Sequence, residues 1–335
     1  MILWMRNSGE FRDVVVSSRI RLARNLDNYK FPNRIGVDEA KLVYDDVTKS
    51  LDNKRYSEFK IKDIPIIERT MLVEKHIISP ALLYTPNISG FAMSEQEDET
   101  IMINEEDHIR IQVLDSGLSL KKSWEKADEL DNQLGNSLKY AYDEKIGYLT
   151  SCPTNLGTGL RASVMLHLPA MEMTKEINKV LATIAQFGLA VRGVYGEGTK
   201  ALGSLYQISN QSTLGDSEET IIKKIDHVTR QIADKERIIR ENIFKKSAIS
   251  FEDKIFRAYG ILKNTRIIST DEAVRLISFL KLGITSGLIT DNNINDIDKL
   301  FIEIQPASLQ FISRKEMSDM ERDIKRAEVI RNKIN

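Results

Sequence analysis

The sequence has little of what marks several protein classes. Only one of its 335 residues is a cysteine, so no internal disulfide can form, which is compatible with a reducing compartment. Basic and acidic residues number 48 and 49, and this balance offers no electrostatic footprint for nucleic acid or an anionic membrane. No apolar run approaches the roughly 18 residues that a membrane span needs, and no signal peptide is evident. We therefore expect a soluble, cytoplasmic protein without a nucleic-acid or membrane partner.

Length and local pattern indicate two domains. A chain of 335 residues exceeds the size at which one hydrophobic core stops growing. Short β-branched runs, separated by Gly, Asn and Asp, predict strands at residues 13–18, 100–103, 109–114, 146–150, 189–195 and 204–209. We predict an α+β domain over residues 12–220, with a mostly antiparallel sheet flanked by helices, and an all-α C-terminal domain over residues 221–335.

Helical signals support this division. Residues 174–187 predict an amphipathic helix that Gly188 closes. After residue 216 the chain becomes rich in charge, and one helix face collects Ile221, Ile222, Ile225, Val228 and Ile232. Two capping boxes, Ser269 with Glu272 and Ser313 with Glu316, predict the starts of two further helices.

Residues 151–161, Ser-Cys-Pro-Thr-Asn-Leu-Gly-Thr-Gly-Leu-Arg, combine a thiol, a tight turn and an arginine. Gly157 and Gly159 would let backbone N–H groups approach an anion, and Arg161 can clamp a phosphate. The segment lacks the lysine and spacing of a Walker loop, so a nucleotide here would need arginines from elsewhere. The alternative is a glycine-rich turn beside a buried Cys152.

Three other charged segments bear on this one. Arg19 and Arg21 share a face if residues 17–21 are extended, because strand side chains alternate. Residues 104–110 form a dense acidic turn that contains Glu106 and ends in Arg110, and residues 192–199 place Arg192 and Glu197 on a glycine-punctuated loop. Taken singly, each segment is also typical of solvated charges or strand-end salt bridges.

Together, residues 17–21, 104–110, 152–161 and 192–197 resemble the catalytic domain of the ATP:guanidino phosphotransferase (phosphagen kinase) family over roughly residues 12–215. The family's creatine and arginine kinases carry a helical domain before this one and lack the helical extension found here. A catalytic domain that is followed by a helical extension, and is not preceded by a helical domain, resembles the bacterial protein-arginine kinases. The resemblance therefore implies a phosphagen-kinase-like fold.

The resemblance implies ATP as the phosphoryl donor, with Mg²⁺ held mainly by the phosphates and water and no protein ligand to the metal. A triphosphate needs several fixed positive charges. Arg19, Arg21, Arg110, Arg161 and Arg192 match the family's five phosphate-binding arginines. The full expected nucleotide contact set is Ser17, Ser18, Arg19, Ile20, Arg21, His76, Arg110, Arg161, Ala162, Ser163, Val164, Met165, Arg192, Gly193, Val194, Tyr195, Gly196 and Glu197.

For the acceptor, Glu106 and Glu197 match the family's two glutamates that grip a guanidinium and accept its proton. Cys152 matches the family's reactive cysteine, to which we assign substrate positioning. Met165 stands where the small-guanidino kinases have an adenine-stacking histidine. His76 resembles the other adenine-side histidine, although a partly exposed loop or helix histidine is the alternative.

The C-terminal run Arg322, Asp323, Ile324, Lys325, Arg326 and Ala327 resembles an allosteric phosphoarginine pocket of the protein-arginine kinases. Arg322 and Arg326 are four apart and share a helix face. An ordinary solvated helix also contains such charges.

These features predict a protein-arginine kinase that transfers the γ-phosphoryl group of ATP to arginine side chains. The resemblance further implies protein substrates such as a heat-shock repressor and unfolded proteins, marking for the Clp unfoldase and protease, a role in the stress response, a zinc-binding activator protein as partner, and a homodimer. A small-molecule phosphagen kinase is the first alternative. A non-enzymatic phosphoarginine-binding adaptor is the second.

Overall fold

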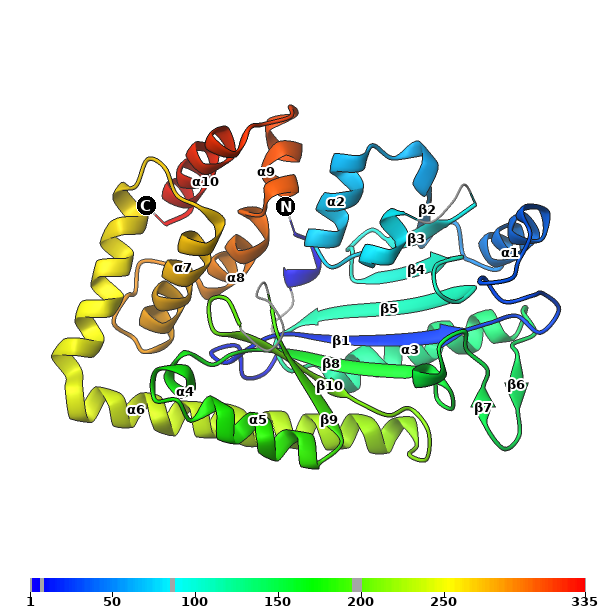
Figure 1. The fold of residues 1–335 in the computed structure, drawn as a ribbon, viewed down its shortest axis with the longest axis horizontal. Helices are drawn as coiled ribbons and strands as arrows, with labels where there is room; N and C mark the ends of the chain where they lie inside the picture. Colours follow the sequence, from blue (N-terminus) through cyan, green and yellow to red (C-terminus); the bar gives the residue numbers. More distant parts are fainter. Residues whose placement is uncertain (1, 7–8, 85–87, 195–200, 335) are drawn as a thin grey trace.

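A computed structural model describes residues 2–6, 9–84, 88–194 and 201–334. Its centre is an eight-stranded sheet with every strand pairing antiparallel, in the order β2-β3-β4-β5-β1-β8-β10-β9 (Figure 1). In chain order the strands are β1 (Val15–Arg24), β2 (Tyr56–Lys60), β3 (Gly90–Ser94), β4 (Glu99–Ile103), β5 (Ile109–Ser116), β8 (Leu160–His167), β9 (Leu189–Gly193) and β10 (Leu205–Asn210). The predicted α+β class is confirmed.

One face of the sheet is apolar and covered by helices. Ile20 and Leu22 of β1 and Val164 of β8 lie in a core formed with three helices, α3 (Leu120–Gly135), α5 (Ile177–Gln186) and the first half of α6 (Glu218–Asn264). Because side chains alternate along a strand, the polar residues between these apolar ones must point to the opposite face. That opposite face carries Arg19 and Arg21 of β1, whereas Arg24 lies on the helix side and pairs with Asp131 of α3.

The C-terminal region is helical, as predicted. The helix α6 is 47 residues long and bends at Ser247, where φ is −150°. Its second half joins a separate core with α7 (Thr270–Thr285), α8 (Ile294–Glu303) and α10 (Asp319–Ile334), and the N-terminal Ile2, Trp4 and Met5 pack into the same core. The helix α9 (Pro306–Ser313) contacts α8 and α10. Figure 1 shows α6 running along the sheet and then turning beside these helices. The division at residue 220 stays a prediction, since α6 runs across it.

The remaining elements are short or peripheral. They are the helices α1 (Val37–Lys49), α2 (Ile66–Glu74) and α4 (Pro169–Met173), the 3-10 turns η1 (Trp4–Arg6), η2 (Ile61–Asp63), η3 (Pro80–Leu83) and η4 (Pro153–Asn155), and the small hairpin β6 (Tyr142–Asp143) with β7 (Gly147–Tyr148). The strand expected at residues 146–150 is therefore only two residues long. Among the described helices, none is both long and apolar enough to span a bilayer.

Of the predicted helix signals, the apolar face over residues 221–232, the closing Gly188 and the cap at Ser269 are confirmed, and the capping box at Ser313 is wrong. Gly188 follows α5 with φ +68°, and Ser269 Oγ accepts a hydrogen bond from the N–H of Glu272 at 3.3 Å. The capping box expected at Ser313 and Glu316 does not form, because Ser313 is the last residue of α9. The box lies five residues later. Ser318 Oγ accepts from the N–H of Glu321, and the Glu321 carboxylate accepts from the N–H of Ser318.

Candidate active site

Strand register places the predicted arginines on one face of the sheet. Residues paired across antiparallel strands point to the same side. Arg21 pairs with Arg161 of β8, and Arg19 pairs with Ser163. Ala23, on the same side of β1, pairs with Arg110 of β5. Arg192 of β9 pairs with Gln207 of β10, Gln207 pairs with Met165 of β8, and Met165 pairs with Ser17 of β1, so Arg192 also lies on this side. The face that carries these five guanidinium groups is called the arginine face below.

The arginine face holds positive charge with few counter-charges. Arg19 donates to Gln207 Oε1 at 3.1 Å and to Ser163 Oγ at 3.4 Å, and Arg161 donates to Ser209 Oγ at 3.2 Å. These partners are neutral. Within the part of the chain that the structure describes, no carboxylate lies within ion-pairing distance of Arg19, Arg21 or Arg161.

Burial and mutual repulsion perturb this array. Burial, followed by the charges of Arg161 and Arg110, lowers the pKa of Arg19 to about 10. Burial and the neighbouring arginines likewise lower the pKa of Arg21 and of Arg161. The Nε atom of Arg161 is buried and has no hydrogen-bond partner in the part of the chain that the structure covers. Guanidinium groups gathered under these conditions are suited to a polyanion such as a triphosphate.

An acidic turn borders the array at one end. The β4–β5 hairpin turns at Asn104, whose φ of +54° is a conformation that asparagine tolerates better than most residues. The turn places Glu105 and Glu106 on either side of Arg110, with nitrogen–oxygen distances of 2.7 Å to each carboxylate. The Glu105 side chain is 1% exposed and that of Glu106 is 43% exposed, so only Glu106 is open to an incoming group.

The cysteine loop meets the acidic turn through Asp107. One carboxylate oxygen of Asp107 accepts hydrogen bonds from Asn25 Nδ2 at 2.8 Å and from the N–H of Ser151 at 2.7 Å. Cys152 is half-buried, and its Sγ lies 3.0 Å from Thr154 Oγ1. A cavity of about 230 Å³ results, with Arg21, Glu106, Arg110, Cys152 and Arg161 among the residues that line it. The structure thus brings together residues that the sequence holds far apart.

The two glycines of the loop serve close backbone packing. Gly157 has φ +98° and Gly159 has φ +64°. A Cβ at Gly157 would lie 2.5 Å from Thr213 O, and one at Gly159 would lie 2.6 Å from Ala23 O. The N–H groups of Gly157 and Thr158 donate to Tyr148 O and Thr213 O, and are therefore not available to an anion. The positive charge of the site comes from arginine side chains instead.

A second hollow lies further along β1, at the other end of the array. Ser17, Arg19, His76, Leu114, Ser163, Met165 and Gln207 line it. Burial, followed by the charge of Arg19, lowers the pKa of His76 to about 4, so the ring is neutral near pH 7. Among the described residues, its Nε2 has no hydrogen-bond partner. From Ser17 to Arg21 the face extends roughly 13 Å, with the hollow at one end and the Glu106–Cys152 cavity at the other.

Several of the predicted nucleotide contacts point elsewhere. The side chains of Ser18, Ile20, Ala162 and Val164 lie on the opposite face, because Ser18 pairs with Val164 and Ile20 with Ala162. Their contact with a nucleotide would be limited to the backbone. Gly193 ends β9 and pairs with Tyr206, and Val194 packs against the C-terminal core. Tyr195, Gly196 and Glu197 lie outside the described residues.

Comparisons with known proteins agree with this geometry. The model of the ATP:guanido phosphotransferase C-terminal catalytic domain matches residues 39–239, and that of the protein-arginine kinase McsB C-terminal domain matches residues 248–335. A protein-arginine kinase of Halothermothrix orenii is 48% identical over 99% of this chain and 96% of its own. One of Caldanaerobacter subterraneus subsp. tengcongensis is 46% identical over 97% and 98%.

The chain belongs to the protein-arginine kinase family. It is an enzyme of the phosphotransferase class, as predicted. Solved structures agree on the fold. A lombricine kinase has a TM-score of 0.61 at 24% identity, covering 69% of this chain and 68% of its own. The duplicated taurocyamine kinase of Schistosoma mansoni, with bound transition state analog components, has a TM-score of 0.63 at 24% identity, covering 73% and 36%.

The segment of this protein-arginine kinase that was predicted as a phosphoarginine pocket lies on α10. Arg326 is 1% exposed and donates to Ile304 O at 2.9 Å, to Ile268 O at 2.8 Å and to Asp323. Arg322, with a 24% exposed side chain, donates to Met317 O and pairs with Asp319. Ile324 is exposed, Lys325 pairs with Glu328, and Ala327 is buried. In this conformation a phosphoryl group would meet Arg322 and not Arg326, so the pocket stays a prediction.

Sequence reasoning missed the residues that orient the predicted ones. Gln207 and Ser209 accept from Arg19 and Arg161, Glu105 holds Arg110, and Asp107 holds the cysteine loop. A signal existed for the first two, because Gln207 and Ser209 alternate with apolar residues along β10. Glu105 and Asp107 lie within the predicted acidic turn, but adjacent carboxylates cannot be told apart without knowing which one is buried.

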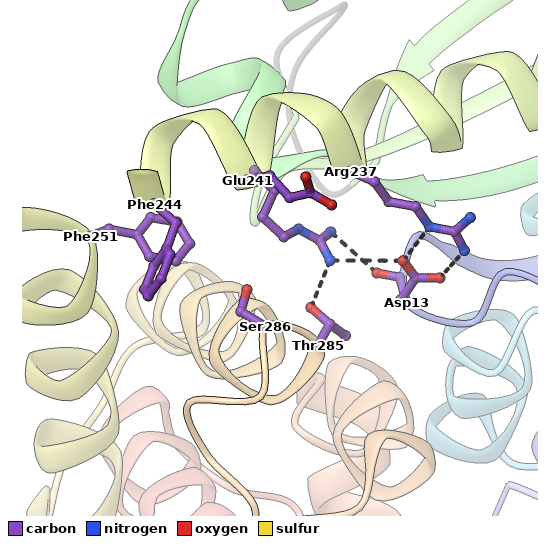
Figure 2. Close-up of a pocket in the computed structure, with 8 residues that line it drawn as sticks. Asp13, Arg237, Glu241, Phe244, Phe251, Thr285 and Ser286 are labelled. Atoms are coloured by element: carbon purple, nitrogen blue, oxygen red, sulfur yellow. Dashed lines mark hydrogen bonds and ion pairs between the residues drawn. The ribbon is translucent and has the colours of Figure 1, made fainter. Parts of the chain in front are cut away.

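A larger cavity, of about 310 Å³, lies near the bend of α6 and contains none of the predicted residues (Figure 2). Asp13 forms a two-pronged ion pair with Arg237, at 2.6 and 2.8 Å. Arg240 donates to Thr285 Oγ1 and lies 3.6 Å from Glu236. Because its arginines are matched by carboxylates, this cavity lacks the unbalanced charge of the arginine face.

Proposed function

We propose that this protein transfers the γ-phosphoryl group of MgATP to arginine side chains of proteins. One observation carries the proposal: the arginine face ends at a cavity that contains an accessible carboxylate and the only thiol of the chain. A polyanionic donor and a cationic acceptor would meet where the two regions join. The names of the curated relatives support the protein as acceptor.

The donor fits the arginine face. Within the described ranges, Arg19 and Arg161 donate to neutral side chains and Arg21 has no side-chain hydrogen bond. Phosphate oxygens would therefore replace the mutual repulsion of these arginines by attraction. Arg110 and Arg192 would complete the set. The base would bind beside His76 and Met165, where the hollow, of about 20 Å³ in this conformation, would have to widen to admit it. The phosphate chain would point towards the Glu106–Cys152 cavity. Mg²⁺, which loses its water ligands reluctantly, would be held mainly by the phosphates and water.

The acceptor requires a carboxylate. A guanidinium keeps its proton up to a pKa of roughly 12.5 to 13.8 and is a poor nucleophile while protonated. Glu106 would bind the substrate guanidinium in place of Arg110, orient one nitrogen for in-line attack, and receive its proton. We propose Glu197 as the second carboxylate and Cys152 as a positioning group beside the acceptor. The attacking nitrogen gains the phosphoryl group as ADP leaves.

The wider role is also proposed. As in the family that the sequence resembles, we propose that the kinase acts in the cytoplasm on a heat-shock repressor and on unfolded proteins, and marks them for the Clp unfoldase and protease. A zinc-binding activator protein, a homodimeric state, and phosphoarginine binding at Arg322–Ala327 belong to the same proposal. These roles can be tested by co-purification, by sedimentation and by phosphoarginine titration.

The test compares a protein with a free acceptor. The full chain is incubated with MgATP and either an unfolded arginine-containing protein or free arginine, and mass spectrometry under non-acidic conditions detects phosphoarginine. We expect modification of the protein and little turnover of free arginine. Rapid turnover of free arginine alone would favour a small-molecule phosphagen kinase. No transfer to either acceptor, with Arg322-dependent binding of phosphoarginine, would favour the adaptor.

A further inference from the structure

The helix α2 lies between the C-terminal helices and the sheet, and it ends two residues before His76. Figure 1 shows α2 beside α9 on one side and close to the strands on the other. Met71 and Leu72 of α2 share a buried cluster with Ala307 of α9 and Phe91 of β3. A shift of α9 would therefore change the packing of α2.

Glu74, the last residue of α2, caps the N-terminus of α9. Its Oε1 accepts from the N–H of Ala307 at 2.8 Å, and its Oε2 accepts from the N–H and the Oγ of Ser308, both at 2.7 Å. Gln305, at the N-cap position of α9, makes no side-chain capping bond. A carboxylate 233 residues away thus satisfies the backbone groups that a local cap would ordinarily satisfy.

The chain just before α9 is held from the other side. Arg326 of α10, buried in the C-terminal core, donates to Ile304 O at 2.9 Å. Two side chains therefore fix the start of α9, one from the C-terminal core and one from α2. The position of α2 is tied in this way to the packing of the C-terminal helices.

The residues that follow α2 are hydrogen-bonded to the arginine face. Gln112 of β5 pairs with Arg21, so its side chain rises from that face, and its Nε2 donates to His76 O at 2.8 Å and to Ile77 O at 2.9 Å. Trp4 Nε1 donates to Lys75 O at 3.1 Å. His76 itself has a φ of +63°, a conformation that a non-glycine residue keeps only when its surroundings hold it. Its ring lines the hollow with Arg19 and Met165.

We propose that Glu74 is a positioning residue through which the C-terminal helices set the place of His76 and thereby the affinity for ATP. The inference rests on the proposed function, because it assigns the hollow beside His76 to the nucleotide base. Glu74 touches neither substrate. Its carboxylate holds the start of α9 by hydrogen bonds, and its backbone leads directly into Lys75 and His76.

The test is Glu74→Gln in the full chain. Glutamine has nearly the same shape, but it loses the charge and one of the two acceptor oxygens, so the cap on α9 weakens. We expect the KM for ATP to rise about three- to tenfold, as for the loss of roughly one hydrogen bond, while the KM for the protein substrate stays within twofold. The matched control is Glu321→Gln, which removes a capping carboxylate from α10 that does not contact α2. That control should leave the KM for ATP unchanged.

The double variant Glu74→Gln/His76→Ala separates positioning from simple destabilisation. If Glu74 acts through His76, the two effects on the KM for ATP are not additive, and Glu74→Gln adds nothing once His76 is alanine. Fully additive effects, or an unchanged KM in a folded Glu74→Gln, would overturn the inference. Should Glu74→Gln fail to fold, Ser308→Ala removes one bond to the same carboxylate and serves the same comparison.

Different experimental results would contradict the inference and the proposed function. If His76→Ala and Arg161→Ala both leave the KM for ATP unchanged, the assignment of the nucleotide to this face is wrong, and the inference falls with it. If those variants raise the KM and Glu74→Gln does not, only the inference is wrong. The fluorescence of Trp4, in a Trp124→Phe background, gives a second readout. We expect it to change in Glu74→Gln, since the indole N–H binds Lys75 O.

Discussion

Replacing Gly159 by alanine tests whether close packing under the cysteine loop requires glycine at this position. The residue has φ +64°, and an alanine there costs about 1–2 kcal/mol. The new Cβ would also lie 2.6 Å from Ala23 O and from Arg24 Nη1. Arg24 is 1% exposed, and its Nη1 donates to Thr158 O at 3.0 Å while its Nη2 pairs with Asp131 at 2.7 Å. Displacing it would break at least one buried charge-assisted bond, at about 1.5–3 kcal/mol.

The expected loss of unfolding free energy is therefore about 2.5–5 kcal/mol, measured by urea denaturation followed by circular dichroism. Gly215→Ala is the matched control, because Gly215 also has a positive φ, +97°, but a Cβ there would meet nothing within 4 Å. It should lose only the conformational part, about 1–2 kcal/mol. Equal losses for the two variants would refute the argument that contact with Ala23 and Arg24 requires glycine at residue 159.

Two further predictions concern charge. Burial raises the pKa of Glu236, which caps α4, to about 7 from an ordinary 4.5. The folded state therefore binds this proton more tightly than the unfolded chain, and the free energy of unfolding should fall by roughly 3 kcal/mol as pH rises from 4.5 through 7. Glu236→Gln should remove this part of the pH dependence in denaturation curves, and an unchanged curve would contradict it. MgATP at about 100 times its Kd should stabilise the wild type by about 2.7 kcal/mol in thermal melts. Arg161→Ala should diminish that gain at equal MgATP without destabilising the ligand-free protein, because it relieves like-charge repulsion; a destabilised variant that keeps the full gain would count against the arginine face.

The local pattern of the sequence predicted the elements that depend on local chemistry. The strands over residues 100–103 and 109–114 and the helix closed by Gly188 are present, because each rests on spacing within a few residues. Alternation also placed Arg19 and Arg21 on one face. The capping box at Ser313 failed for a local reason as well. Arg314 adopts φ +53° and ends α9, and the next helix begins only after Ser318.

What the sequence could not predict depends on long-range pairing. Arg110, Arg161 and Arg192 entered the candidate site by resemblance, whereas the structure explains their meeting by the register of four strand pairs. Gln207 orients Arg19 and Glu105 orients Arg110. Which arginine each one contacts follows from the strand register. Glu74 could not have been singled out, since its partners on α9 lie 233 residues away.

The central claim is that Glu106 takes the acceptor guanidinium while the arginines hold the donor. The most direct test is Glu106→Gln, assayed in parallel for binding of MgATP and for phosphoarginine formation on an unfolded protein. The account predicts ATP affinity within about threefold of the wild type, since Glu105 still holds Arg110, together with a loss of transfer of at least about 100-fold, the usual size of a general-base contribution. Transfer that persists within a few fold of the wild type, in a folded variant that binds ATP, would contradict it.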